Sequence, residues 1–199
     1  MVAPTVLSSA PMSEVGVNPP SDPRPSTSQV LIAGWGVMGV VGLLGQAIWR
    51  LGGRSLQAFR EGELGLLELA FTVGWVAIMA YAEGYRAFQQ HLVPRTVLRA
   101  FHLGANPRTV FVLLAPAFCL SLLHATRRRL VASWTLLLGI SGLVLAVHRL
   151  PFPWRGLIDA GVAVGLGWGA IAMLVQFGRA LTGARLTGSA DLPEERIAR

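Results

Sequence analysis

The feature that most constrains this chain is a pair of long apolar runs near its C-terminal end. Residues 130–147 carry no charge, residues 160–178 carry none either, and a short connector with two arginines and two prolines separates them. At 1.5 Å per residue, each run as a helix covers roughly the 30 Å of a bilayer's hydrocarbon core. Both runs therefore predict membrane-spanning helices, joined as a hairpin.

The composition of the whole chain agrees with a membrane protein. Of its 199 residues, 53% are hydrophobic and only 14% are charged, whereas soluble domains carry about 25% charged residues. The net charge of +7 comes entirely from arginines in loops and tails, which favours anionic lipid head groups as the counterpart. We therefore expect a lipid bilayer as partner, together with other membrane subunits or further copies of the chain, and no nucleic acid.

Five spans are predicted between two polar tails. Residues 1–29 are rich in proline and serine and predict a disordered tail, while residues 179–199 predict a polar, mobile tail. Residues 30–178 are expected to form an all-α transmembrane domain, a bundle of about five helices with one short surface helix at 94–103. Pro94 and Gly104 mark the start and stop of that surface helix. The expected spans are residues 30–49, 65–83, 109–125, 130–147 and 157–178.

Arginines at the ends of the spans predict an orientation. Arg50, Arg54 and Arg60 follow the first span closely, only Arg24 precedes it, and three consecutive arginines at 127–129 separate the third span from the fourth. Basic residues next to spans concentrate on the cytoplasmic side. With five spans, this predicts an N-terminus outside and a C-terminus in the cytoplasm.

The second span has a polar face. Only residues 69–82 separate Glu68 from Glu83, which is about 21 Å of helix, so one of the two carboxylates should lie within the hydrocarbon zone. A charge that faces lipid is costly, so the face that carries both acids should look into the bundle. That face also holds Thr72, Trp75, Met79 and Arg86.

These and later charges form a candidate polar or ion site, made of Glu68, Glu83, Arg86, His148, Arg155 and Asp159. Asp159 lies one turn after Arg155 and can pair with it, while Glu83 can pair with Arg86 or Arg155 as a structural partner. One interpretation is that the members other than Glu68, which five spans put on one side of the membrane, form a vestibule that binds an anion or a proton-coupled substrate. Glu68 is then a separate candidate for a proton or ion site. The other interpretation is a set of interface ion pairs and head-group anchors, as charges at span ends usually are.

Two spans carry rows of small residues. Gly139 and Gly142 lie on the fourth span, and Gly161, Gly165 and Gly169 lie on the fifth. Spacings of three and four keep such residues on one side of a helix, where they permit close backbone approach. We expect the two rows to pack against each other within the hairpin.

No pattern of a catalytic, cofactor or metal site is recognised. The four histidines have no spacing typical of a metal or haem site, Cys119 is the only cysteine, and no phosphate-binding or dinucleotide fingerprint occurs. The leading hypothesis is a small non-catalytic subunit or assembly partner in a bacterial-type membrane, without cofactor or metal. The alternatives are a small transporter or channel that uses Glu68 and Glu83, and a membrane enzyme acting on lipid or quinone.

Overall fold

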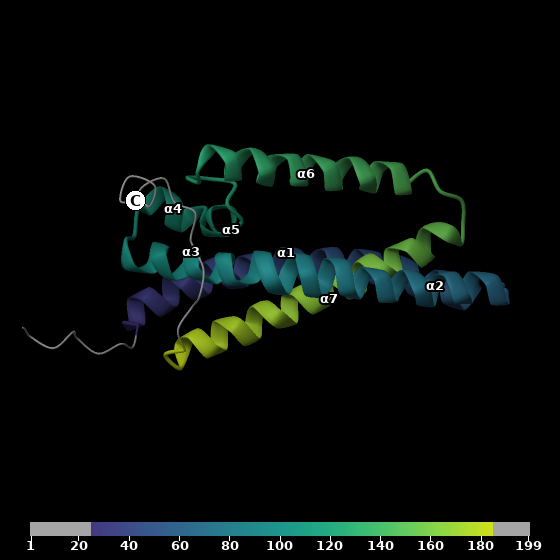
Figure 1. The fold of residues 1–199 in the computed structure, drawn as a ribbon, viewed down its shortest axis with the longest axis horizontal. Coiled ribbons are helices and arrows are strands. Elements are labelled where there is room, and N and C mark those ends of the chain that lie inside the picture. Colours follow the sequence, from purple (N-terminus) through teal and green to yellow (C-terminus); the bar gives the residue numbers. More distant parts are fainter. Residues whose placement is uncertain (1–24, 185–199) are drawn as a thin grey trace, which may run out of the picture.

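The described part of the chain is entirely helical (Figure 1). The structure, a computed structural model, describes residues 25–184, so most of the two expected tails lies outside the described residues. Four stretches are long and apolar enough to cross a membrane, which agrees with the prediction of a multi-helix membrane protein. These stretches are Thr27–Glu61, Leu66–Ala105, Arg127–Val147 and Trp154–Leu181.

The first helix, α1 (Thr27–Glu61), starts at a reciprocal cap. The Ser26 hydroxyl accepts from the Gln29 backbone N–H at 3.4 Å, and the Gln29 side chain accepts from the Ser26 N–H at 2.9 Å. Such a capping box satisfies donors that a helix start leaves unpaired. The helix then continues 35 residues, well past the expected end of the first span. At about 52 Å it is longer than the bilayer core is thick.

The second stretch is one continuous rod of three parts: α2 (Leu66–Met79), the π-helix η1 (Ala80–Leu92) and α3 (Val93–Ala105). The expected separate surface helix is therefore the end of this rod. Pro94 lies in the first turn of α3, directly after the π-helical part, and does not interrupt the rod.

The expected third span at 109–125 is wrong. This segment forms two five-residue helices, α4 (Thr109–Leu113) and α5 (Ala115–Cys119), followed by a tight turn. Leu114 leaves the helical region just before Pro116, and Ser121 and His124 have φ of 60° and 46°, in the left-handed region. A continuous helix cannot pass through such conformations. The segment packs on α1 and α3 instead.

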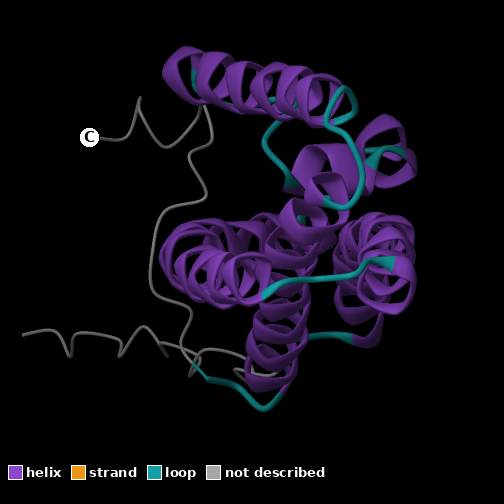
Figure 2. Ribbon diagram, turned by 90° about the vertical axis from the view of Figure 1, so that its right-hand side faces the viewer, coloured by secondary structure: helices purple, strands orange, loops and turns teal. Residues whose placement is uncertain are grey.

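The terminal hairpin has the predicted helices but not the predicted packing. The last two helices are α6 (Arg127–Val147) and α7 (Trp154–Leu181). Figures 1 and 2 show α6 set apart from the α1, α2 and α7 group, and none of its described side chains is buried. A Cβ added at Gly139 or Gly142 would meet nothing within 4 Å. The α7 glycines pack instead on the rod of α2 and η1, which lies alongside α7. This rod occupies the glycine row of α7 that was expected to contact α6.

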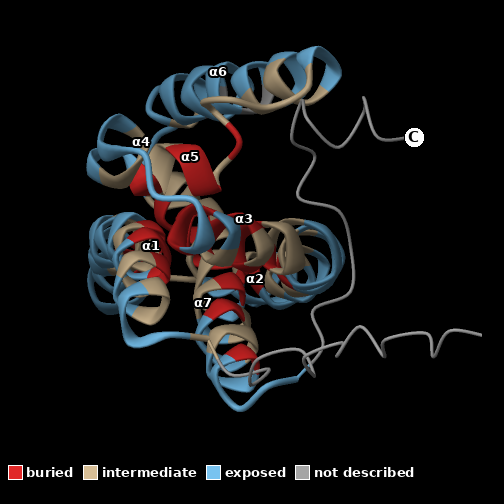
Figure 3. Ribbon diagram, turned by 90° about the vertical axis from the view of Figure 1, so that its left-hand side faces the viewer, coloured by how far each residue is buried: buried red, intermediate tan, exposed pale blue. Residues whose placement is uncertain are grey.

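The core lies where α1, α3, α5 and α7 meet, and Figure 3 shows the buried residues gathered there. Its fully buried members include Val37 of α1, Val97 of α3, Ala115 of α5 and Met173 of α7. The helices alternate in direction, which defines two ends of the molecule (Figure 1). The α1–α2 end holds the α1–α2 and α6–α7 connectors, and the α3–α4 end holds the start of α1, the end of α7, α4 and α5.

Candidate functional site

The residues predicted as one polar site fall in different parts of the structure. His148, Arg155 and Asp159 lie at the α1–α2 end, where the α6–α7 connector leads into α7. Glu68, in the first turn of α2, lies at this same end, whereas Glu83 and Arg86 lie in η1, farther along the rod. The function of these residues stays a prediction, but Glu83 and Arg86 do not lie with the other four.

Asp159 is almost fully buried, at 4% exposure, and its partner is Arg54 of α1. The Arg54 Nη1 and Asp159 Oδ2 atoms are 3.9 Å apart, while Oδ2 has no hydrogen-bond donor among the described residues. The expected pair with Arg155 does not form. Instead, Nη2 of Arg155 lies 2.7 Å from Nδ1 of His148, within hydrogen-bond distance. The Asp159 side chain turns to α1 because Gly156 lets α1 and α7 approach closely there.

Glu83 lies on the face of the rod that contacts α7, as does Trp75, whose indole N–H donates to the Ile158 carbonyl at 3.1 Å. A Cβ added at Gly165 would lie 3.0 Å from Glu83 Oε2, so this carboxylate rests against the α7 backbone. No ion pair joins Glu83 to a described arginine, and Arg86 is exposed. The expected structural pairing of Glu83 is therefore wrong: the helix contact directs its side chain toward glycine.

Glu68 folds back over the start of its own helix. Its Oε2 would lie 2.8 Å from a Cβ at Gly65, the residue that precedes the first turn of α2. A carboxylate in this position interacts favourably with the unpaired N–H groups and the positive end of the helix dipole. This geometry supports a structural role for Glu68.

Arg99, which the sequence did not single out, is the most deeply placed charge of the described chain, at 0% exposure. It donates through Nε to the Phe118 carbonyl at 2.7 Å and through Nη2 to the carbonyls of Leu123 and His124 at 2.8 and 3.0 Å. Its guanidinium also lies 4.3 Å from the centre of the Phe118 ring. Arg99 thus fixes the turn after α5, which no local pattern in the sequence reveals.

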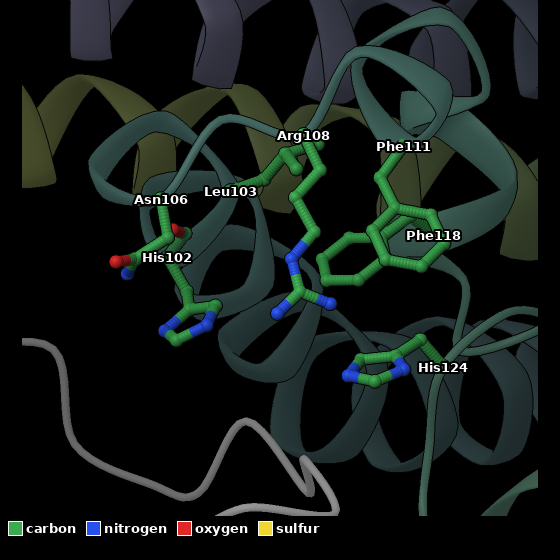
Figure 4. Close-up of a pocket in the computed structure, with 7 residues that line it drawn as sticks. All are labelled: His102, Leu103, Asn106, Arg108, Phe111, Phe118 and His124. Atoms are coloured by element: carbon green, nitrogen blue, oxygen red, sulfur yellow. The ribbon is translucent and has the colours of Figure 1, made fainter.

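That turn forms one wall of a pocket of about 260 Å³ at the α3–α4 end. Figure 4 shows the Arg108 guanidinium between the imidazoles of His102 and His124, with Phe111 and Phe118 beside it and Asn106 at the rim. Leu103 completes the lining. Among residues 25–184 no carboxylate lines this pocket, so its described lining offers mainly hydrogen-bond donors beside an apolar wall.

Comparison with known proteins identifies no relative: no family model, curated protein or solved structure matches the chain. Within residues 25–184, no group of three or more His, Cys, Asp or Glu side chains is arranged to hold a metal ion. The geometry of the described residues is therefore the basis for any assignment of function.

Proposed function

We propose that this protein is a non-catalytic membrane subunit whose α6 helix associates with the same helix of a second copy. The support is a contrast between two glycine rows of similar spacing. Trp75, Glu83 and Phe88 contact the glycine row on α7. On α6, by contrast, a Cβ added at Gly139 or Gly142 would have no neighbouring atom within 4 Å. Small residues at such spacings let membrane helices approach closely, and the open row is free to be used in this way.

A second copy is the occupant that fits the open row. The α7 row, which could have covered α6, is already filled within the described chain. A row of small residues on one helix is complementary to the same row on a copy related by two-fold symmetry. Such a dimer requires no surface beyond α6 itself.

The transport alternative has less support. It relied on Glu68 and Glu83 as acids on one polar face of the second span. The Glu68 carboxylate lies over Gly65, at the start of α2, and the Glu83 carboxylate rests against Gly165 of α7. The two acids thus have separate packing environments and do not line a common path.

For the membrane orientation, we infer that both ends of the described chain face the cytoplasm. Four crossings put the start of α1 and the end of α7 on one side, in contrast to the five-span prediction of an outside N-terminus. Five arginines lie at the α1–α2 end: Arg50, Arg54, Arg60, Arg149 and Arg155. Seven lie at the α3–α4 end: Arg95, Arg99, Arg108, Arg127, Arg128, Arg129 and Arg179. The positive-inside rule favours the second end as cytoplasmic.

The association of α6 is tested by disulfide cross-linking in native membranes. In a Cys119→Ala background, Gly139→Cys places a thiol on the open row, and Leu137→Cys places one about 200° away on the same helix. We expect oxidation to convert the Gly139→Cys protein, but not the Leu137→Cys protein, to a species of twice the 21.3 kDa chain mass.

Other outcomes separate the alternatives. Cross-linking of Gly139→Cys to a band of another mass would show that a different membrane protein occupies the row, against the second copy. Equal dimer yields from both variants would indicate random collision, and no cross-link from either would remove the support for association through α6.

A further inference from the structure

We propose that the pocket lined by Arg108, His102, Asn106 and His124 binds the phosphate group of an anionic lipid head group. Its position, charge and size each point to such a ligand. It lies at the α3–α4 end, shortly before the start of the apolar, membrane-crossing stretch Arg127–Val147. A head group at the membrane surface can therefore reach it.

The sequence that builds the pocket contains basic residues and no acidic ones. From residue 84 to residue 158 the chain has no aspartate and no glutamate. Within this stretch, the segment around the pocket holds two histidines and six arginines: His102, His124, Arg95, Arg99, Arg108, Arg127, Arg128 and Arg129. None of the described residues that line the pocket is acidic, so the described lining favours an anion as ligand.

The donors that face the pocket are placed to act together. The guanidinium of Arg108 lies between the His102 and His124 rings (Figure 4), and the side chains of Arg108 and His102 make no hydrogen bond or ion pair within residues 25–184. Arginine presents its N–H groups in a planar fork that matches two oxygens of a phosphate. The His102 imidazole and the second N–H of the Asn106 amide, whose nitrogen also lies 3.5 Å from the His102 carbonyl, add further donor capacity.

The opposite wall of the pocket explains why a lipid fits better than a free anion. Phe111, Phe118 and Leu103 supply an apolar surface next to the donors, which suits a ligand that carries glycerol and acyl carbons beside its phosphate. A pocket of about 260 Å³ is below the roughly 300 to 1,000 Å³ of sites for whole cofactors or drug-sized ligands. The three arginines at 127–129, three residues after His124, would strengthen attraction to anionic lipid.

Hydrogen bonds from Arg99 fix the turn that carries His124. Arg99 binds the carbonyls of Leu123 and His124, and these bonds fix the backbone of the His124 wall independently of any ligand. The pocket is therefore formed in advance, which lowers the ordering cost of binding.

The test measures binding of the first lipid to the full-length protein in neutral detergent by native mass spectrometry, with phosphatidylglycerol and phosphatidylcholine as probes. A second arm measures the melting temperature in inorganic phosphate and in chloride at equal ionic strength. The variants are Arg108→Gln and His102→Gln, and the control is Arg149→Gln, an exposed arginine in the α6–α7 connector.

We expect Arg108→Gln to weaken phosphatidylglycerol binding about tenfold, equal to about 1.4 kcal/mol, and His102→Gln to weaken it in the same direction. Arg149→Gln should bind like the parent, and inorganic phosphate should have little effect on melting. A phosphate-dependent rise in melting temperature that Arg108→Gln abolishes, with unchanged lipid binding, would identify free phosphate as the ligand and overturn the lipid assignment.

Two further results would contradict the proposal that this pocket is an anion-binding site. One is an equal loss of lipid binding in Arg108→Gln and Arg149→Gln, which would indicate general attraction to a positive surface. The other is unchanged response to both probes in Arg108→Gln and His102→Gln. If Arg108→Gln alone fails to fold, as judged by its melting curve, the exposed His102→Gln variant decides between these outcomes.

Discussion

The guanidinium of Arg99 sets the path of the chain after α5. The last carbonyls of a helix have no partner within the helix, and here the buried arginine supplies donors to the carbonyl of Phe118 and to those of the following turn. Ser121 and His124 adopt left-handed backbone conformations, which are unfavourable for residues other than glycine. The bonds to Arg99 compensate for that strain and keep Cys119 at 1% exposure.

Replacing Arg99 by Gln should therefore open this region. The Phe118 carbonyl would keep the Ser121 N–H as a donor, but the carbonyls of Leu123 and His124 would lose theirs. A buried carbonyl left without a donor costs about 1–3 kcal/mol, so we expect a loss of about 1–3 kcal/mol in unfolding free energy. The measurement is the rate at which a maleimide labels Cys119, together with thermal unfolding in detergent. Labelling should be much faster in Arg99→Gln than in the parent. The matched control is Arg86→Gln at an exposed arginine, and similar labelling rates in both variants would contradict this role.

Replacing Glu83 by Gln should leave the protein as stable as the parent or more stable. No described arginine pairs with this carboxylate, so Gln leaves no buried cation without a partner. The neutral amide also avoids the cost of holding a carboxylate away from water against Gly165. Thermal unfolding of the two proteins side by side is the measurement. A clear drop in melting temperature for Glu83→Gln would mean that its charge is structural after all.

Charge pairs show why residue contacts were only partly predictable. Spacings of three and four correctly indicated which side chains share a helix face, and the face with Trp75 and Glu83 does contact α7. The same spacings suggested pairs within one helix, yet Asp159 pairs with Arg54 from another helix. Local spacing indicates which partners are possible, whereas the packing of neighbouring helices decides among them.

The π-helical turns of η1 keep the rod in register with α7. Contacts along α7 recur every four residues, at Gly165 and Gly169, but the residues that meet them, Glu83 and Phe88, are five apart. In an α-helix, five residues would turn the second side chain by about 140° away from the first. Bonding between residues five apart brings them back to one face, so the wide turns allow both contacts.

Two alanine substitutions on α7 test this contact. At Gly169 an added Cβ would lie 2.5 Å from Phe88 Cδ1, whereas at Gly167 it would meet nothing within 4 Å. We expect Gly169→Ala to lower the unfolding free energy by about 1–3 kcal/mol, as overpacking does. Gly167→Ala should be neutral or slightly stabilising, because alanine favours helix. Both are measured by thermal unfolding in detergent, and equal melting temperatures would show that α7 and η1 do not pack this closely.

The terminal helices show which elements a sequence can and cannot predict. Long uncharged runs predicted α6 and the apolar part of α7, because length and charge alone decide whether a helix can cross a membrane. The segment at 109–125 has the same composition, but Pro116 and the turn held by Arg99 break it. Likewise, the glycines of α7 predicted close packing, but not that the partner would be η1.

At the scale of the whole molecule, the two longest rods are longer than the bilayer core is thick. The Leu66–Ala105 rod has 40 residues, or about 60 Å as an α-helix, against a core of roughly 30 Å. Its large exposed apolar side chains, such as Leu66, Val73 and Tyr81, lie in its first half. The polar second half packs on α1 and α7 at the α3–α4 end. Hydropathy predicted the apolar half, but a polar helical extension depends on tertiary partners that the sequence does not reveal.

The four-crossing arrangement makes a prediction about sidedness. Helices α1 and α7 have their outer ends, Thr27 and Leu181, at the same end of the molecule (Figure 1). In a Cys119→Ala background, single cysteines at Ser13 and at Ser189 should both resist a membrane-impermeant maleimide in intact cells, and both should react after permeabilisation. A cysteine at Gln57, near the opposite end of α1, should react in intact cells and serves as the control. Labelling of Ser13→Cys but not of Ser189→Cys from outside would require an odd number of crossings, and would restore a further span between α3 and α6.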